Sequence, residues 1–177
     1  VGRHLTGPAP FFWVFHVIRD YAATLRAGGS RMAGDLPRFL DIAARLEAAQ
    51  VPMPVVFGHH DLLPANLMDD GSRLWLVDWE YGGFGTPLFD LANLAGNAGM
   101  PPVDERAMLQ GYFGQAPGPA LWRAYGAMKV ASLLRETLWS LVSELHMNAP
   151  GVDYAAYTAE NLDRFRAALS EFEESEG

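Results

Sequence analysis

Three side chains that carry oxygen, Asp61, Asn66 and Asp78, have the types and spacing of a site for phosphate chemistry. Asp61 and Asn66 are five positions apart in the segment 58–66, so one loop can direct both side chains into the same cleft. Asp78 follows the apolar run 74–77 and returns to that cleft on the next strand. Carboxylate and carboxamide oxygens are ligands that suit Mg²⁺. We therefore expect the three side chains to converge on one Mg²⁺ ion and one substrate hydroxyl.

Phosphoryl transfer from ATP to an alcohol requires this combination of groups. One carboxylate must orient the hydroxyl and accept its proton, and two oxygen donors must hold Mg²⁺ on the phosphates. We assign Asp61 as the catalytic base, and Asn66 and Asp78 as the metal ligands. The alternative for Asp61 is a loop carboxylate that only caps a backbone turn.

Two adjacent histidines, His59 and His60, raise a second hypothesis, a Zn²⁺- or Fe²⁺-dependent hydrolase. Adjacent side chains on an extended segment point to opposite faces, which disfavours joint coordination. No other histidine lies at the spacing of a metal ligand. We expect His59 instead to brace the catalytic loop through hydrogen bonds.

A β-hairpin is expected to position the metal ligands. An Asp-Gly turn within residues 69–72 separates two apolar runs, which is a strong hairpin signal. Such a ribbon brings Asn66 and Asp78 to the same end. Asp69 and Asp70 lie at the far end and are expected to face solvent.

Most of the remaining sequence has helical periodicity. A first helix with Phe11 facing inward ends at Gly28, the strand 55–57 delivers the catalytic loop, and the glycine-rich segment 82–87 is expected to be irregular. We predict an α+β fold, mostly α, with helices around a small β-hairpin that carries the catalytic loop. The further helices expected are 36–46, capped by Asp35, then 88–94 opened by Pro87, 103–113, 119–146, and a last one that Asp153 caps.

Composition narrows the classes of protein. A chain of 177 residues suits a single domain. The net charge is −8, from 21 acidic and 13 basic residues without a basic run, so nucleic acid and anionic membranes are poor partners. There is no cysteine, no apolar run approaches the roughly 20 residues of a membrane span, and no signal peptide is visible. The expected location is the cytoplasm.

Several separated motifs resemble one family of kinases. The order H-x-D-x-x-x-x-N and then D is that of the catalytic half of the protein-kinase signature. More closely, the chain is similar to the choline/ethanolamine kinase branch of the aminoglycoside-phosphotransferase-like kinases, nearly throughout from about Asp20. The segments that carry this resemblance are 59–66, 77–81, 89–93, 134–140 and 153–157.

The resemblance implies further roles for two acidic residues. Glu80, two positions beyond Asp78, points to the same face of an extended chain. It either contacts a second Mg²⁺, as in the similar kinases, or forms a salt bridge. Asp90 is expected to be structural and to bond to the backbone of the catalytic loop. ATP and Mg²⁺ are the cofactors that the family implies.

The acceptor pocket that the resemblance implies contains Trp139 and Tyr157, because a quaternary ammonium is recognised by aromatic faces. The alternative is that both are ordinary core aromatics. Two positions depart from the family pattern. Glu136 stands where eukaryotic choline kinases carry another tryptophan, and Asn97 stands where they carry a glutamate. Our hypothesis is that Glu136 supplies the negative charge from another direction.

One element of a complete kinase is missing from the sequence. The one lysine, Lys129, follows the catalytic motifs, although such kinases hold the α/β-phosphates with an upstream lysine. Residues 28–34 are glycine-rich but lack a preceding strand. We expect residues 1–177 to form the C-terminal lobe of a kinase-like fold, without the N-terminal nucleotide lobe. Alone it should be inactive and self-associate into homo-oligomers through an exposed lobe surface.

The sequence therefore predicts an ATP- and Mg²⁺-dependent phosphotransferase that acts on the hydroxyl of a small molecule. A choline-like cation is the favoured acceptor. Alternative acceptors are an aminoglycoside, a thiamine-like cation or a sugar. A third alternative is a non-catalytic lobe that binds a cationic ligand or a protein partner.

Overall fold

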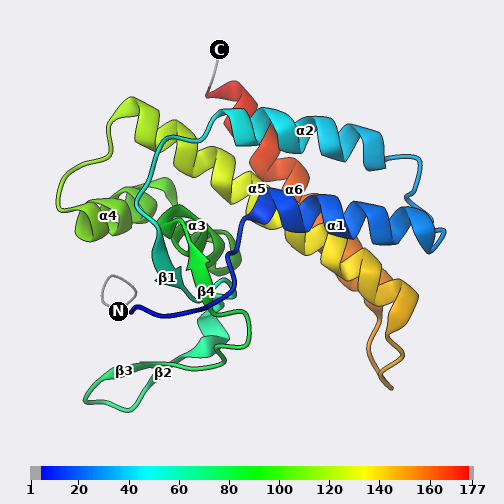
Figure 1. The fold of residues 1–177 in the computed structure, drawn as a ribbon, viewed down its shortest axis with the longest axis horizontal. Coiled ribbons are helices and arrows are strands. Elements are labelled where there is room, and N and C mark those ends of the chain that lie inside the picture. Colours follow the sequence, from blue (N-terminus) through cyan, green and yellow to red (C-terminus); the bar gives the residue numbers. More distant parts are fainter. Residues whose placement is uncertain (1–4, 176–177) are drawn as a thin grey trace.

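A computed structural model describes residues 5–175 of the chain and shows a mostly helical protein with two small antiparallel sheets (Figure 1). The α+β, kinase-like class expected from the sequence is confirmed. In chain order the elements are α1 (Val14–Ala27), α2 (Leu36–Ala48), β1 (Val56–Gly58), the 3₁₀ turn η2 (Pro64–Asn66), β2 (Leu67–Asp69), β3 (Leu74–Leu76), β4 (Gly83–Gly85), α3 (Pro87–Ala98), α4 (Pro102–Phe113), α5 (Pro119–His146) and α6 (Tyr154–Glu174).

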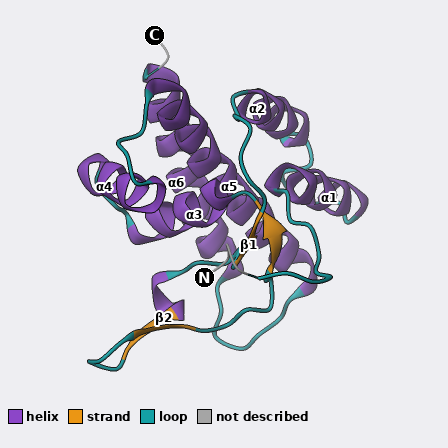
Figure 2. Ribbon diagram, turned by 60° about the vertical axis from the view of Figure 1, so that its left-hand side comes forward, coloured by secondary structure: helices purple, strands orange, loops and turns teal. Residues whose placement is uncertain are grey.

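The long helix α5 is the centre of the hydrophobic core. It packs against α1, α2, α3 and α6, and Figure 2 shows these helices gathered around it. Met128, Leu134, Leu138 and Leu141 on α5 are fully buried. Burial of a side chain of this size stabilises the fold by about 1.5–3 kcal/mol. The core therefore fixes the position and the rotation of α5.

Each of the two sheets consists of two antiparallel strands, and β1 and β2 flank the predicted catalytic loop in the sequence. In one, β1 pairs with β4, with Phe57 opposite Phe84, and in the other β2 pairs with β3, with Met68 opposite Trp75. The β2–β3 ribbon confirms the predicted hairpin. The expectation of an irregular segment 82–87 was wrong, because residues 83–85 form β4.

The chain before α1 lies against β4. The N–H of Phe12 donates to the Phe84 carbonyl at 2.7 Å, and the N–H of Phe84 donates to the Pro10 carbonyl at 2.8 Å. A Cβ atom at Gly85 would lie 2.9 Å from the Phe12 carbonyl oxygen, so glycine permits this close approach. Phe11 was predicted to face inward from the first helix, but it precedes α1 and is 60% exposed.

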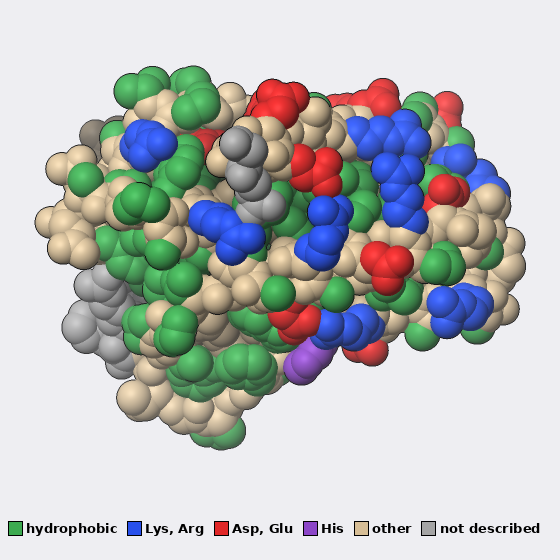
Figure 3. Space-filling view, turned by 90° about the horizontal axis from the view of Figure 1, so that it is seen from above, with side chains coloured by type: hydrophobic (Ala, Val, Ile, Leu, Met, Phe, Trp, Pro, Cys, Tyr) green, Lys and Arg blue, Asp and Glu red, His purple; other side chains and the backbone are tan. Residues whose placement is uncertain are grey.

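Charged side chains of both signs cover the outer faces of the helices. They are interspersed on the face that Figure 3 shows, and ion pairs such as Arg19–Glu47 and Arg45–Glu173 join neighbouring helices. Exposed pairs of this kind each contribute at most about 1 kcal/mol. Within residues 5–175, none of the helices has both the length and the apolar character needed to cross a membrane.

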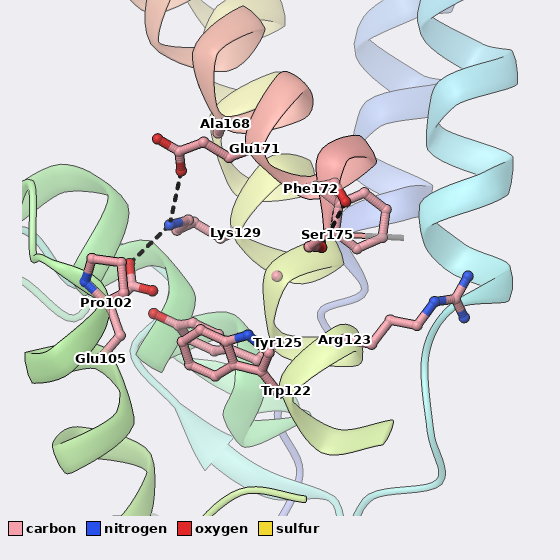
Figure 4. Close-up of a pocket in the computed structure, with 11 residues that line it drawn as sticks. Pro102, Glu105, Trp122, Arg123, Tyr125, Lys129, Ala168, Glu171, Phe172 and Ser175 are labelled. Carbon is pink, nitrogen blue, oxygen red and sulfur yellow. Dashed lines mark hydrogen bonds and ion pairs between the residues drawn. The ribbon is translucent and has the colours of Figure 1, made fainter. Parts of the chain in front are cut away.

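A cavity of about 240 Å³ lies between α4, α5 and α6, away from the predicted catalytic loop (Figure 4). Trp122 and Phe172 form part of its apolar wall. Nζ of Lys129 lies 2.9 Å from Oε1 of Glu105, whose side chain is only 2% exposed, and 3.8 Å from Oε2 of the exposed Glu171. The one lysine of the sequence is therefore committed to a buried ion pair.

Replacing Lys129 by methionine should destabilise the protein, because it leaves the Glu105 carboxylate buried without a countercharge. We expect a loss of about 3 kcal/mol in the free energy of unfolding, measured by urea denaturation. The double variant Lys129→Met with Glu105→Gln should recover part of that loss. Glu171→Gln is the matched control and should cost less than about 1 kcal/mol. An unchanged urea midpoint for Lys129→Met would show that the pair does not stabilise the fold.

Candidate active site

The backbone of the predicted catalytic segment is held by one carboxylate from helix α3. Oδ2 of Asp90 accepts a hydrogen bond from the N–H of His59, and Oδ1 accepts one from the N–H of His60, both at 2.7 Å. Asp90 lies in the first turn of α3, where the helix dipole favours a negative charge. Hydrogen bonds to an ionised acceptor are short and strong. Two consecutive peptide groups are thus fixed immediately before Asp61.

The imidazole of His59 joins this segment to the chain before Asp78. Its Nδ1 accepts from the N–H of Asp61 at 3.3 Å, and its Nε2 lies 2.8 Å from the Val77 carbonyl oxygen. Nδ1 must therefore be the unprotonated nitrogen, and Nε2–H donates to Val77. His59 is 1% exposed, so this bracing contact is shielded from water.

The structure joins Asp61 to Asn66 by a hydrogen bond and holds the residue before Asp78 against Asn66. Nδ2 of Asn66 donates to the main-chain carbonyl of Asp61 at 2.9 Å. The Asn66 carbonyl in turn accepts from the N–H of Val77 at 3.1 Å, which brings Asp78 next to the end of η2. Asp78 has a left-handed backbone, with φ of 64°, and is exposed.

The oxygen atoms left free in this neighbourhood suit a hard cation. The amide nitrogen of Asn66 is used within the fold, which leaves Oδ1 as an acceptor. Among residues 5–175, no hydrogen bond or ion pair engages the carboxylate of Asp78. Glu80 is exposed in the turn after it, and the described residues contain no group of three or more His, Cys, Asp or Glu side chains that could hold a metal. The donors present are therefore the carboxamide of Asn66 and the carboxylate of Asp78, and Glu80 is a further exposed carboxylate two residues later.

His60 points away from this neighbourhood into the protein core. Its ring stacks on Phe12, with the ring centroids 4.2 Å apart and the planes 11° from parallel. Its Nδ1 lies 3.1 Å from the Tyr81 carbonyl oxygen. Burial lowers the pKa of His60 below its usual value, although Asp90 opposes this effect. The two adjacent histidines therefore do not form a joint metal site.

The three residues of the expected acceptor pocket lie together on α5 and α6. The Tyr157 hydroxyl donates to Oε1 of Glu136 at 2.8 Å. The Trp139 and Tyr157 rings meet edge to face, with centroids 6.2 Å apart. Burial, and then the negative charge of Glu136, raise the pKa of Tyr157 to about 12. At neutral pH the Tyr157 hydroxyl thus keeps its proton and donates a hydrogen bond to the side chain of Glu136.

Asn97, the other position that departs from the family pattern, is occupied by contacts within the fold. Its Nδ2 donates to the Asn93 carbonyl at 2.9 Å, one turn earlier on α3. Its Oδ1 lies 3.3 Å from Nη2 of Arg164 on α6, which also donates to the Gly96 carbonyl at 2.7 Å. A cationic group therefore stands beside Asn97, the position at which the family pattern has a glutamate.

A residue that the sequence reasoning missed, Arg135, connects the two halves of the site. It is 3% exposed, and its Nη1 lies 3.5 Å from Oδ1 of Asp61 and 3.3 Å from Oε2 of Glu136. A signal was present in the sequence. Arg135 falls on the stripe of α5 that Ala131 and Leu138 define at helical spacing, and a charge on such a stripe needs a buried partner.

Comparisons with known proteins found a matching family and several similar chains. The profile of the phosphotransferase enzyme family matches residues 9–130. Protein LicA of Haemophilus influenzae is 30% identical over 119 residues, which cover 64% of this chain and 43% of that protein. Ethanolamine kinase 2 of Rattus norvegicus is 24% identical over 192 residues, which cover 96% of this chain and 48% of that protein.

Solved structures show the same fold. The crystal structure of a choline/ethanolamine kinase family protein from Mesorhizobium loti superimposes with a TM-score of 0.83 and 30% identity, over 96% of this chain and 60% of that one. The chain thus spans about half the length of the curated relatives it matches.

Replacing Asp90 by asparagine should loosen the catalytic segment. The amide can accept from one of the two N–H groups, but its NH₂ group then faces the other. We expect the free energy of unfolding to fall by about 2–4 kcal/mol, measured by urea denaturation. The exposed Asp41→Asn should stay within about 0.5 kcal/mol of wild type. Hydrogen exchange at the His59 and His60 amides should also accelerate in Asp90→Asn, and unchanged exchange there would contradict the assigned contact.

Proposed function

The chain belongs to the phosphotransferase enzyme family, and from this membership we propose that the protein transfers the γ-phosphoryl group of ATP to the hydroxyl of a small alcohol. The observation that carries the proposal is that Asn66 is hydrogen-bonded both to Asp61 and to Val77, the residue before Asp78. Its groups are those that phosphoryl transfer needs: a carboxylate for the hydroxyl and oxygen donors for Mg²⁺. A turn-capping role alone would not require all three.

In this proposal Asp61 is the catalytic base. Its carboxylate is 21% exposed, so it can meet a substrate hydroxyl while its main chain stays fixed by His59 and Asn66. It orients the hydroxyl toward the phosphorus atom and accepts the proton as the new P–O bond forms. Because the transition state is loose, correct placement of the hydroxyl contributes more than strong basicity.

Asn66 and Asp78 would hold Mg²⁺ through Oδ1 and the free carboxylate. When bound, Mg²⁺ neutralises the charge on the phosphate oxygens. The exposed position of Asp78 fits this role, since its side chain is left without an internal partner among residues 5–175. We keep Glu80 as a candidate ligand of a second ion, because it follows Asp78 by two residues and is equally exposed.

We propose an ammonium alcohol of the choline type as the acceptor. The edge-to-face pair of Trp139 and Tyr157 offers aromatic surface for a cation, and Glu136 supplies a negative charge beside it. Arg135 joins this pocket to Asp61, so an acceptor bound there would have its hydroxyl near the base. The names of the relatives, which include an ethanolamine kinase, support this class of substrate.

The group that grips the ATP phosphates is proposed to lie outside residues 1–177. Lys129 is committed to Glu105 at the cavity between α4, α5 and α6, so it is not available for a nucleotide. The ribbon β2–β3 presents exposed Met68, Leu74 and Trp75, which suit packing against a nucleotide lobe. On this proposal, residues 1–177 alone would turn over poorly.

Replacing Asp61 by asparagine should abolish most of the activity of the complete gene product that contains this chain. The amide keeps the shape of the side chain but cannot accept the proton. We expect kcat to fall by about 10²- to 10⁴-fold, measured as ADP formation with choline or ethanolamine. Asp69→Asn, at the far end of the hairpin, should leave kcat unchanged. If Asp61→Asn kept full turnover, Asp61 would not be the base.

Replacing Asp78 by asparagine should weaken Mg²⁺ binding while preserving the backbone, because asparagine tolerates a positive φ. We expect the Mg²⁺ concentration for half-maximal activity to rise by about 10-fold or more, since a ligand charge is lost. Glu80→Gln tests the neighbouring carboxylate in the same titration, and it shifts the Mg²⁺ requirement only if Glu80 also binds an ion. An unshifted titration for Asp78→Asn would remove it from the metal site.

A further inference from the structure

Arg135 is a buried cation that stands between two carboxylates from different parts of the fold. Its Nη1 lies 3.5 Å from Oδ1 of Asp61, in the catalytic segment, and 3.3 Å from Oε2 of Glu136, its neighbour on α5. The ring of Tyr81 covers it from another side, with the guanidinium carbon 5.4 Å from the ring centroid. Arg135 therefore contacts both the proposed base and the proposed acceptor pocket.

The carboxylate of Asp61 is held by fewer contacts than its main chain. The N–H and the carbonyl of Asp61 are bound by His59 and Asn66. By contrast, the carboxylate of Asp61 forms an ion pair with the guanidinium of Arg135, at 3.5 Å from Nη1. Rotation about χ2 of an aspartate is soft, so a fixed main chain does not fix the direction of its oxygens. Arg135 supplies that restraint.

Both carboxylate oxygens of Glu136 have a partner. Oε1 accepts from the Tyr157 hydroxyl at 2.8 Å, and Oε2 faces Arg135. A continuous line of polar contacts therefore runs from Tyr157 through Glu136 and Arg135 to Asp61. Because α5 is locked by the core, this line sets the base at a defined place relative to the acceptor pocket.

Stability alone does not account for an arginine at this place. Its Nε is buried and has no hydrogen-bond partner within the described part of the chain, which costs free energy. An apolar side chain of similar volume often replaces a buried ion pair without loss of stability. With 3% of its side chain exposed, Arg135 also does not present a surface to which a substrate can bind directly.

We propose that Arg135 is a positioning residue for the phosphoryl transfer, which orients the carboxylate of Asp61 toward the hydroxyl of the acceptor. This inference rests on the proposed function. Arg135 acts through Asp61 and Glu136, and it takes no part in proton transfer. Its loss should therefore affect the chemical step more than acceptor binding.

The test compares Arg135→Met and Arg135→Lys with wild type in the complete gene product. For Arg135→Met we expect kcat to fall by about 10- to 100-fold, while KM for choline or ethanolamine changes by less than about threefold. Arg135→Lys keeps the charge and should recover part of kcat. Arg45→Met, which removes an exposed ion-paired arginine on α2, is the matched control and should leave kcat unchanged.

A double variant separates orientation of the base from general damage. In the Asp61→Asn background, Arg135→Met should cost much less than in wild type, because the carboxylate that it orients is already absent. An equal loss in both backgrounds would overturn the proposal, as would a rise in KM with kcat unchanged. Circular dichroism establishes whether each variant is folded. If Arg135→Met does not fold, the same comparison is made with Arg135→Lys.

Failure of the proposed function would give a different result. In that case wild type itself forms no ADP with any alcohol. The contact between Arg135 and Asp61 is then tested by the urea midpoints of Asp61→Asn, Arg135→Met and their double variant. Additive shifts in these midpoints would overturn the pairing of Arg135 with Asp61, and non-additive shifts would support it.

Discussion

The carboxylate of Asp90 is the constraint on which the geometry of the site depends. It binds two consecutive N–H groups of the catalytic segment, and it leaves no room around them. A Cβ atom at Gly58 would lie 2.9 Å from Oδ2 of Asp90 and 2.6 Å from Nε2 of His60. The segment therefore needs glycine at 58, and its path is set by α3 before any functional side chain is considered. That path in turn determines the positions of His59, Asp61 and Asn66.

The site combines a rigid part and an open part. Asp61 follows residues that are bound at their N–H groups, and its own main chain is held on both sides. Asp78, by contrast, is exposed, has a strained left-handed backbone and lies beside a thin two-stranded ribbon. A base must be preorganised, because an error in its direction affects the barrier directly. A cation ligand can instead be drawn into place by the charge of the ion, so the looser end of the site suits the metal.

Local signals in the sequence were sufficient for many elements. The helix expected over 119–146 is α5 with the same bounds, since proline at its start and a regular apolar spacing define it. Asp153 caps α6 by accepting from the N–H of Ala156 at 2.9 Å. The strand β4 could not be predicted in this way, because its partner β1 lies about 25 residues earlier and its residues Gly83 and Gly85 have low strand propensity. Phe11 had the helical spacing of a core residue, but pairing with Phe84 keeps it extended.

Arg135 shows why the site was harder to predict from the sequence than the fold. Helix α5 must satisfy two requirements at once, since the same turns that fill the core also face the catalytic segment. At most positions of α5 an apolar residue meets the requirement of the core without disturbing the catalytic segment. At Arg135 they conflict, because a charge is placed on the stripe that packs inward, and its Nε remains without a partner in the described fold. A position that breaks the local pattern without a gain in packing is expected where function selects the residue. The break in the periodicity of α5 is therefore informative in itself, and the nearest carboxylates, Asp61 and Glu136, indicate what the charge is for.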